Sequence, residues 1–194
     1  MEFKNLEVSD TAAIMGLRNF IEEKHGQIDV LINNAGMYFY PTTDNTEHFV
    51  QVQRTLDINY WGMKNVISSF LSLMSDQSRI VNMSSYHGHL SRIPGRSIQM
   101  QLGRQKTTNF FLPLRINLFY SKLTKPYYIG DSSLTEKRLD DLMMEYQRHS
   151  TEFNYDFEEV GWPRCAYTVS KVAVNAYTRI LQRQLEEQGN LHFK

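Results

Sequence analysis

Two side chains near the end of the chain could move a proton together. In Tyr167-Thr-Val-Ser-Lys171, a phenol and an ammonium group stand four residues apart, on one face if the segment is helical. A cation beside a phenol stabilises the phenolate form and lowers the pKa of the phenol. The spacing therefore suits a phenol that donates a proton to a substrate. The same spacing occurs at Tyr60 and Lys64, so the pair alone does not identify a site.

Polar residues also follow two apolar runs. Asn33-Asn-Ala-Gly36 follows the run 28–32, and Ser84-Ser-Tyr-His-Gly88 follows the run 79–83. Open α/β sheets place their ligand sites at the carboxyl ends of the strands. Between the two runs, Asn59-Tyr-Trp-Gly62 falls within a predicted helix. The order of these segments predicts that they meet at one edge of a sheet.

The elements that must position these residues alternate between strand and helix. The pattern predicts strands at 3–8, 28–32 and 79–83 and helices at 11–25, 46–74 (with one bend) and 167–188. Ser9 and Asp10 are candidate caps of the first helix, and Gly26 ends it. The β-branched run 28–32 is typical of a strand buried on both faces of a parallel sheet. The alternation predicts an α/β, doubly wound parallel sheet.

The four motifs stand in the order strand-NNAG, helix-NxxG, strand-SSxxG and YxxSK, which resembles the short-chain dehydrogenase/reductase family. Gly161-Trp-Pro163, and the 82 positions from Ser85 to Tyr167, resemble its monomeric carbonyl reductase type. The resemblance implies a Rossmann-like fold and NADPH-dependent reduction of aldehydes, ketones or quinones to alcohols. It also implies a monomer in the cytoplasm. A relative that acts on steroids or pterins would differ only in its substrate.

The resemblance also assigns roles to the catalytic residues. Tyr167 would protonate the carbonyl oxygen, and Lys171 would assist it and hold the nicotinamide ribose. Ser85 would donate a hydrogen bond to the substrate oxygen. Asn59 would hold a water molecule that links Lys171 to solvent. Tyr60, which lies beside Asn59, would take no part in catalysis.

The same resemblance assigns residues to the cofactor. Asn34, Ala35 and Gly36 would line its adenosine side. Glu7 and Val8 match the position that contacts adenine, although the family usually has an aspartate there. Tyr167 and Lys171 would bind the nicotinamide end.

The resemblance implies one partial catalytic domain over 1–194 with an insertion at 91–160. Ser133-Leu-Thr-Glu136 predicts a capping box that opens a helix in the insertion. The apolar side of this helix consists of Leu139, Leu142, Met143 and Tyr146. No Asp or Glu occurs from 85 to 130, and the part at 95–120 is either an extra loop or sequence foreign to the mature protein.

Composition limits the partners. The formal net charge is zero, so no basic excess favours nucleic acid or a membrane surface, and no run of about 18 apolar residues predicts a membrane span. The start of the chain has no apolar run typical of a signal peptide. Cys165 is the only cysteine, which fits a reducing compartment. We predict that Cys165 is a small side chain without a chemical role. His87 and His89 have no third ligand at a metal-site spacing, so we predict no metal and place them on a pocket wall or the surface.

The family's Gly-x-x-x-Gly-x-Gly loop, which holds the pyrophosphate, is absent from the sequence. We therefore expect a chain cut at both ends, without the first two strands and the sixth strand of the sheet. Two hypotheses remain open. The first is a reductase, or a fragment of one, that binds NADPH weakly and reduces carbonyls poorly. The second is a non-catalytic isoform or remnant that acts, if at all, by binding a partner.

Overall fold

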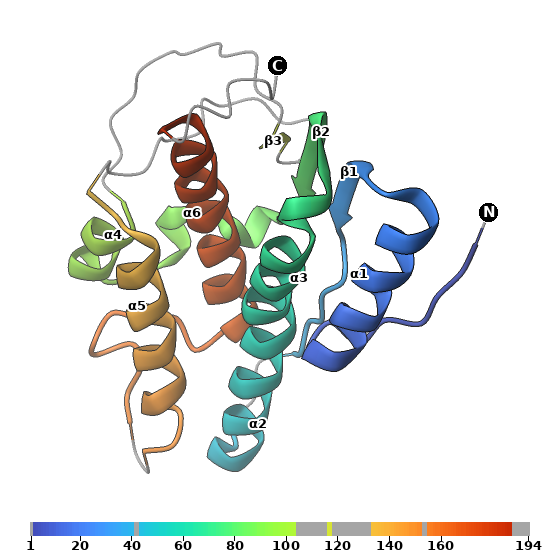
Figure 1. The fold of residues 1–194 in the computed structure, drawn as a ribbon. Coiled ribbons are helices and arrows are strands. Elements are labelled where there is room, and N and C mark those ends of the chain that lie inside the picture. The colour runs from blue at the N-terminus through green and yellow to red at the C-terminus, as the bar shows by residue number, and fades with distance from the viewer. Residues whose placement is uncertain (1, 41–42, 104–115, 118–132, 153–154, 188–194) are drawn as a thin grey trace.

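The computed structural model describes residues 2–40, 43–103, 116–117, 133–152 and 155–187 (Figure 1). Its first helix, α1 (Thr11–His25), begins where the sequence offers a cap. The Asp10 carboxylate accepts hydrogen bonds from the backbone N–H groups of Ala12 and Ala13, at 2.8 and 3.2 Å. Gly26 ends the helix with a φ of 78°, a conformation that favours glycine. The predicted bounds of this helix are confirmed.

In the described part of the chain, three parallel strands form the sheet, in the order β1-β2-β3. The strand β1 spans Ile28–Asn33, β2 spans Met74–Asn82 and β3 is the short Ile116–Asn117. Leu31 lies opposite Ile80, so the two predicted strands are adjacent and parallel. The structure confirms an α/β fold around a parallel sheet that is incomplete.

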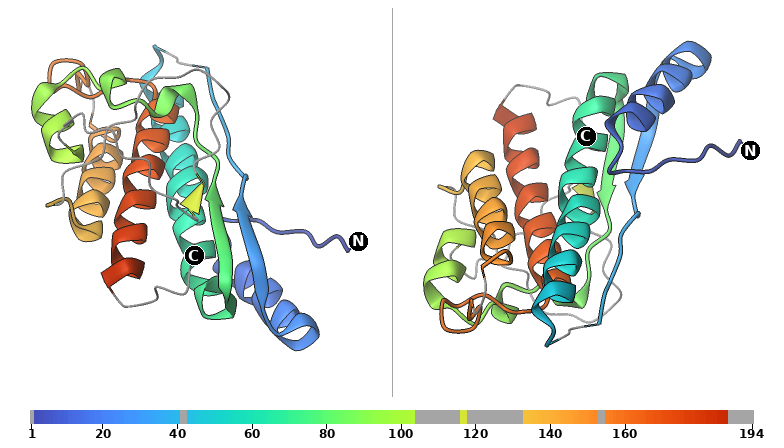
Figure 2. Two further views of the ribbon diagram at one scale, coloured as in Figure 1. Left: turned by 90° about the horizontal axis from the view of Figure 1, so that it is seen from above. Right: turned by 90° about the horizontal axis from the view of Figure 1, so that it is seen from below.

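The strand β1 is not buried on both faces, as its sequence had predicted. The side chains of Val30 and Ile32 are 52% and 60% exposed, whereas Leu31 packs against the core. Figure 2 shows the reason, because α2, α3 and α6 all lie on one side of β1 and β2. Among the described residues, no helix covers the other face of β1.

The predicted strand at 3–8 is also wrong. This segment has no regular structure, and Phe3 is 81% exposed. Its apolar residues cannot form a strand there, because no described strand lies beside them to pair with their backbone groups. Only Val8 is buried, in a cluster with Ile14 of α1 and with Val66 and Phe70 farther along the chain.

The long helix predicted at 46–74 is divided into four parts. The helix α2 (Asn45–Leu56) continues through a π-helical turn (Asp57–Gly62) into α3 (Met63–Phe70). A short 3₁₀ turn (Leu71–Leu73) then leads into β2, which begins at Met74, five residues before the predicted start of the strand at 79. The expected bend thus corresponds to the π-helical turn, which contains Asn59, and such turns are frequent at functional sites.

Three further helices complete the described fold. The helix α4 spans Arg96–Leu102 within the acid-free stretch, α5 spans Glu136–His149 and α6 spans Ala166–Glu187. Most of the stretch at 95–120 lies outside the described residues. No helix in the described ranges combines the length and apolar composition that a membrane span requires.

The inserted helix α5 has the apolar face that its sequence predicted, but a different cap. Leu139, Leu142, Met143 and Tyr146 are all buried in the main core, where they pack with residues of α2, α3 and α6. The cap is Thr135 rather than Ser133, because Thr135 immediately precedes the first helical residue with an extended backbone. Its hydroxyl accepts a hydrogen bond from the N–H of Arg138 at 3.2 Å.

Candidate active site

The Gly161-Trp-Pro163 segment fixes the chain just before α6. Gly161 has a φ of 90° and accepts a hydrogen bond from the N–H of Gly95 at 2.8 Å. The two glycines cross so closely that a Cβ added to either would lie 2.5 Å from the Cα of the other. Trp162 is buried, and the hydroxyl of Tyr146 donates to the carbonyl of Pro163 at 3.0 Å. The inserted helix α5 thereby holds the start of α6, which carries Tyr167.

Lys171 lies one helical turn after Tyr167 and is buried, with 5% of its surface exposed. Its Nζ donates a hydrogen bond of 2.7 Å to the carbonyl oxygen of Met83, the residue directly after β2. The same Nζ lies 5.6 Å from the centre of the Tyr167 ring. Burial lowers the pKa of Lys171, because desolvation disfavours the charged ammonium. The spacing along α6 therefore brings a partly desolvated cation close to a phenol.

Asn59, in the π-helical turn, connects the loop after β1 to α6. Its Oδ1 accepts from the N–H of Met37 at 2.8 Å, while its Nδ2 donates to the carbonyl of Met37 at 2.9 Å and to the hydroxyl of Ser170 at 3.0 Å. A Cβ added at Gly36 would lie 3.2 Å from Asn59 Oδ1 and 3.6 Å from Lys171 Nζ. The backbone at Gly36 thus passes directly over both predicted site residues.

Ser85 follows β2 and precedes a 3₁₀ turn, Tyr86–Gly88. Its Oγ accepts a hydrogen bond from the N–H of His87 at 3.2 Å. The turn is fastened to α6 because Asn175 donates to the carbonyl of Gly88 at 2.8 Å. Only glycine fits at position 88, since a Cβ there would lie 2.6 Å from the amide nitrogen of Asn175. The SSxxG motif thereby holds Ser85 next to the helix that carries Tyr167.

His87 connects this turn directly to Tyr167. Its Nδ1 lies 2.9 Å from the hydroxyl of Thr168, and its ring lies 5.5 Å from that of Tyr167 in an edge-to-face contact. Tyr38 also contacts the Tyr167 ring, at 5.0 Å and nearly perpendicular. Burial, and secondarily the charge of Arg92, lower the pKa of His87, so its imidazole is neutral at pH 7.

The second pair with the same spacing, Tyr60 and Lys64, lies in a different environment. The hydroxyl of Tyr60 donates to Asp140 at 2.7 Å, and Lys64 forms ion pairs with Asp140 at 2.6 Å and Glu136 at 2.8 Å. Burial, and then the hydrogen bond to Asp140, raise the pKa of Tyr60. A phenol with a raised pKa that is already bonded to a carboxylate is poorly suited to proton transfer. This pair instead fastens α5 to α3.

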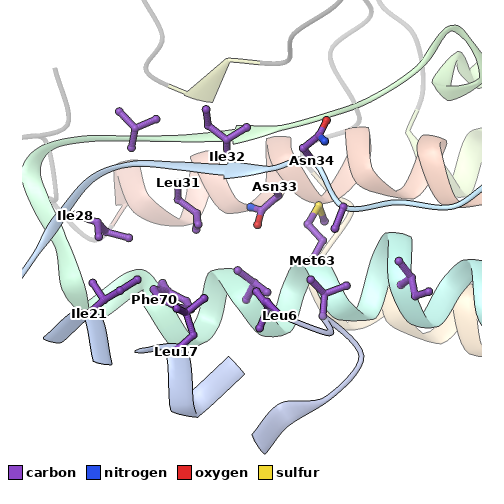
Figure 3. Close-up of a pocket in the computed structure, with 15 residues that line it drawn as sticks. Leu6, Leu17, Ile21, Ile28, Leu31, Ile32, Asn33, Asn34, Met63 and Phe70 are labelled. Atoms are coloured by element: carbon purple, nitrogen blue, oxygen red, sulfur yellow. The ribbon is translucent and has the colours of Figure 1, made fainter. Parts of the chain in front are cut away.

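The structure divides the predicted cofactor residues into two groups. Gly36, Tyr167 and Lys171 lie together, whereas Val8, Asn34 and Ala35 line a hollow of about 290 Å³ beside β1 (Figure 3). Glu7 lies in neither group, and its carboxylate accepts hydrogen bonds from the backbone N–H and hydroxyl of Ser9, at 3.2 and 2.9 Å.

The lining of the hollow is mostly apolar and contains no charged side chain. Figure 3 shows that its walls come from β1, α1 and α3. Apart from Val8, Asn34 and Ala35, the lining residues are Leu6, Leu17, Ile21, Ile28, Val30, Leu31, Ile32, Asn33, Ile58, Met63, Val66 and Phe70. This hollow therefore offers no cation to the pyrophosphate of a dinucleotide.

Several contacts at the site were not predicted from the sequence. The backbone of Met37 and the carbonyl of Met83 hold Asn59 and Lys171, and nothing in a residue type signals such a backbone contact. Thr168 directly follows Tyr167, and this position in the chain was the only available signal for its contact with His87.

The other sequence candidates can also be placed. His89 packs edge to face against Tyr86 at 5.4 Å, and Cys165 is half-buried with a free thiol. Among the residues that the structure describes, no group of three or more His, Cys, Asp or Glu side chains is arranged to hold a metal ion.

Comparisons with known proteins agree with the motifs. A family model described as "short chain dehydrogenase" matches residues 1–97, half of the chain. The chain is 32% identical over 186 residues to carbonyl reductase [NADPH] 3 of Mus musculus, covering 96% of this chain and 57% of the relative. It is 30% identical over 186 residues to carbonyl reductase [NADPH] 1 of Bos taurus, with the same coverage. The chain thus spans little more than half the length of these relatives.

A solved structure has the same arrangement of elements. Salutaridine reductase from Papaver somniferum superposes with a TM-score of 0.72 and 26% sequence identity. The match covers 95% of this chain and 65% of that structure.

Proposed function

Because the chain belongs to the short-chain dehydrogenase family, we propose that it is built to reduce aldehydes, ketones or quinones to alcohols with NADPH. The observation that carries the proposal is the placement of the buried Lys171 ammonium beside the Tyr167 ring and the Gly36 backbone. The relatives at about 30% identity are named as NADPH-dependent carbonyl reductases, which supports the choice of cofactor and reaction.

In this proposal, side chains of the protein bind and protonate the carbonyl oxygen of the substrate. Tyr167 donates a proton to that oxygen, and Ser85 donates a hydrogen bond to it. Lys171 stabilises the phenolate that remains on Tyr167, because a cation close to a phenolate lowers its energy. NADPH, when bound, supplies the hydride that adds to the carbonyl carbon. Asn59 is a positioning residue whose hydrogen bonds to Met37 and Ser170 hold the loop after β1 against α6.

The cofactor would extend from the catalytic residues toward the hollow beside β1. Gly36, Tyr167 and Lys171 would hold the nicotinamide ribose, and Asn34 and Ala35 would line the adenosine side. The two remaining candidates for the adenosine side are Glu7 and Val8. We also propose a monomer in a reducing compartment such as the cytoplasm, since α5 covers the outer sides of α2 and α6.

One observation favours a second candidate function. Val30 and Ile32 are largely exposed, and the apolar hollow adjoins them at the edge of the sheet. Large exposed apolar side chains on a sheet favour association with another polypeptide. A chain that acts without catalysis, by binding a partner, would account for this surface.

Titration of the 194-residue chain with NADPH separates the two functions. We expect saturable binding, followed by the fluorescence of the nicotinamide, that is weaker than micromolar because the hollow has no charge to attract the pyrophosphate. Lys171→Met should weaken binding further. Lys64→Met is the matched control, since Lys64 is a half-buried lysine at the same spacing from a tyrosine, and it should bind NADPH like the wild type. Absence of any NADPH binding would overturn the reductase proposal and favour the second function.

A further inference from the structure

The surroundings of the Tyr167 phenol are aromatic on more than one side. Tyr38 meets the Tyr167 ring at 5.0 Å with an angle of 87° between the planes, and His87 meets it at 5.5 Å with an angle of 72°. The rings of Tyr38 and His87 are 6.2 Å apart. The three rings therefore form one cluster, which we call the Tyr167 ring cluster.

The loop after β1 adds a fourth ring at the edge of this cluster. Tyr40 contacts Tyr38 edge to face at 5.4 Å. Tyr38 remains 44% exposed and Tyr40 82% exposed. Exposed aromatic surface is costly in water, and it gains free energy when another flat ring covers it. The cluster thus presents uncovered ring surface beside the proposed proton donor.

The position of His87 is fixed independently of any substrate. Its Nδ1 is hydrogen-bonded to Thr168, which is 4% exposed and follows Tyr167 directly in α6. Its backbone N–H donates to Ser85 Oγ. The residue proposed to bind the carbonyl oxygen and the ring beside Tyr167 therefore belong to the same short turn. A neutral imidazole in this place acts as an aromatic surface rather than as a cation.

From this arrangement we propose that Tyr38 and His87 are specificity-determining residues that select flat, unsaturated carbonyl compounds, such as quinones and aryl ketones, over saturated ones. A carbonyl group held between Ser85 and Tyr167 would place its substituents next to these two rings. A flat ring can stack on them or meet them edge to face, whereas a puckered saturated ring cannot. The inference rests on the proposed function, because it assumes that the carbonyl binds at Tyr167.

The size of the preference follows from the strength of aromatic pairs. One such contact changes affinity by about threefold to tenfold. We therefore expect the wild type to bind naphthoquinone at least threefold more tightly than decalone, a saturated bicyclic ketone of similar size. Replacing either ring by a non-aromatic residue should remove about one such factor from the preference.

The test measures the affinity of the 194-residue chain for naphthoquinone and decalone by ligand-detected NMR, without cofactor. Tyr38→Leu and His87→Leu should each reduce the preference for naphthoquinone. Tyr38→Phe and His87→Phe keep an aromatic ring and should retain the preference for naphthoquinone. Because His87→Phe also removes the hydrogen bond to Thr168, a retained preference in this variant shows that the ring, and not the hydrogen bond, is responsible. Tyr86→Leu is the matched control, because Tyr86 lies in the same turn but packs against His89 and Arg92 instead of Tyr167.

Each outcome bears on the inference separately from the proposed reductase activity. Equal binding of both ketones by the wild type would overturn the inference, and so would an unchanged preference in the two leucine variants. Loss of the preference in Tyr86→Leu to the same extent would also overturn it. Failure of the proposed function would appear differently, as quinone binding with the expected preference but without any reduction when NADPH is added. Circular dichroism of each variant verifies that the fold is retained.

Discussion

Removal of the Asn59 side chain should destabilise the protein strongly. The side chain is only 2% exposed and makes three hydrogen bonds, two to the backbone of Met37 and one to the hydroxyl of Ser170. Each hydrogen bond contributes about 0.5–1.5 kcal/mol, and a buried partner left without one adds its own desolvation cost. We therefore expect Asn59→Ala to lower the free energy of unfolding by about 2–4 kcal/mol.

Urea denaturation followed by circular dichroism measures this loss. For a chain of this size, each kcal/mol lowers Tm by roughly 2–4 °C, so the fall in Tm should be on the order of 10 °C. Asn65→Ala is the matched control, because Asn65 is exposed on α3, and its effect should stay within about 0.5 kcal/mol. A loss in Asn59→Ala below about 1 kcal/mol would refute the view that Asn59 joins the loop after β1 to α6.

Five further substitutions test other parts of the structure. Gly95→Ala and Gly161→Ala should each lower Tm, because a Cβ at either position would lie 2.5 Å from the Cα of the other glycine. Gly16→Ala, in the exposed part of α1, should instead raise the free energy of unfolding by about 0.5–1 kcal/mol, because alanine favours a helix more than glycine does. Burial lowers the pKa of Lys171 in the folded protein, so between that pKa and the pKa of an unfolded lysine the unfolded state binds more protons. The free energy of unfolding therefore rises with pH across this range, and urea melts of Lys171→Met should show a shallower rise. Burial also lowers the pKa of His48, so the protein loses stability as pH drops below about 6.5, the pKa of an unfolded histidine. Thermal melts of His48→Gln should show a smaller loss of stability, and an equally steep loss would contradict the role given to His48.

The sequence predicted the elements whose signals are local. Asp10 and Gly26 mark both ends of α1, and the apolar face of α5 follows from helical periodicity alone. The order of the four motifs predicted that their segments meet at one edge of the sheet, and the backbone at Gly36 lies close to Asn59 and Lys171.

The errors have physical causes that a local pattern does not contain. The apolar run 28–32 predicted burial on both faces, but exposure depends on which helices cover the sheet, and Val30 and Ile32 remain uncovered. The segment 3–8 has the composition of a strand, yet a strand needs a neighbour to bond its backbone. The contact of His87 with Thr168 joins positions 81 residues apart, so no local pattern could have predicted it.

The central claim is that Tyr167 donates the proton, and the two Tyr–Lys pairs of the chain provide a direct test. NADPH-dependent reduction of naphthoquinone should be measured under single-turnover conditions with the enzyme in excess, which detects even slow conversion. Tyr167→Phe should lower the rate by about 10²–10⁴, the usual contribution of a general acid, while Tyr60→Phe should leave it unchanged despite the same spacing to a lysine. Full activity in Tyr167→Phe, or loss of activity in Tyr60→Phe at retained fold, would contradict the account.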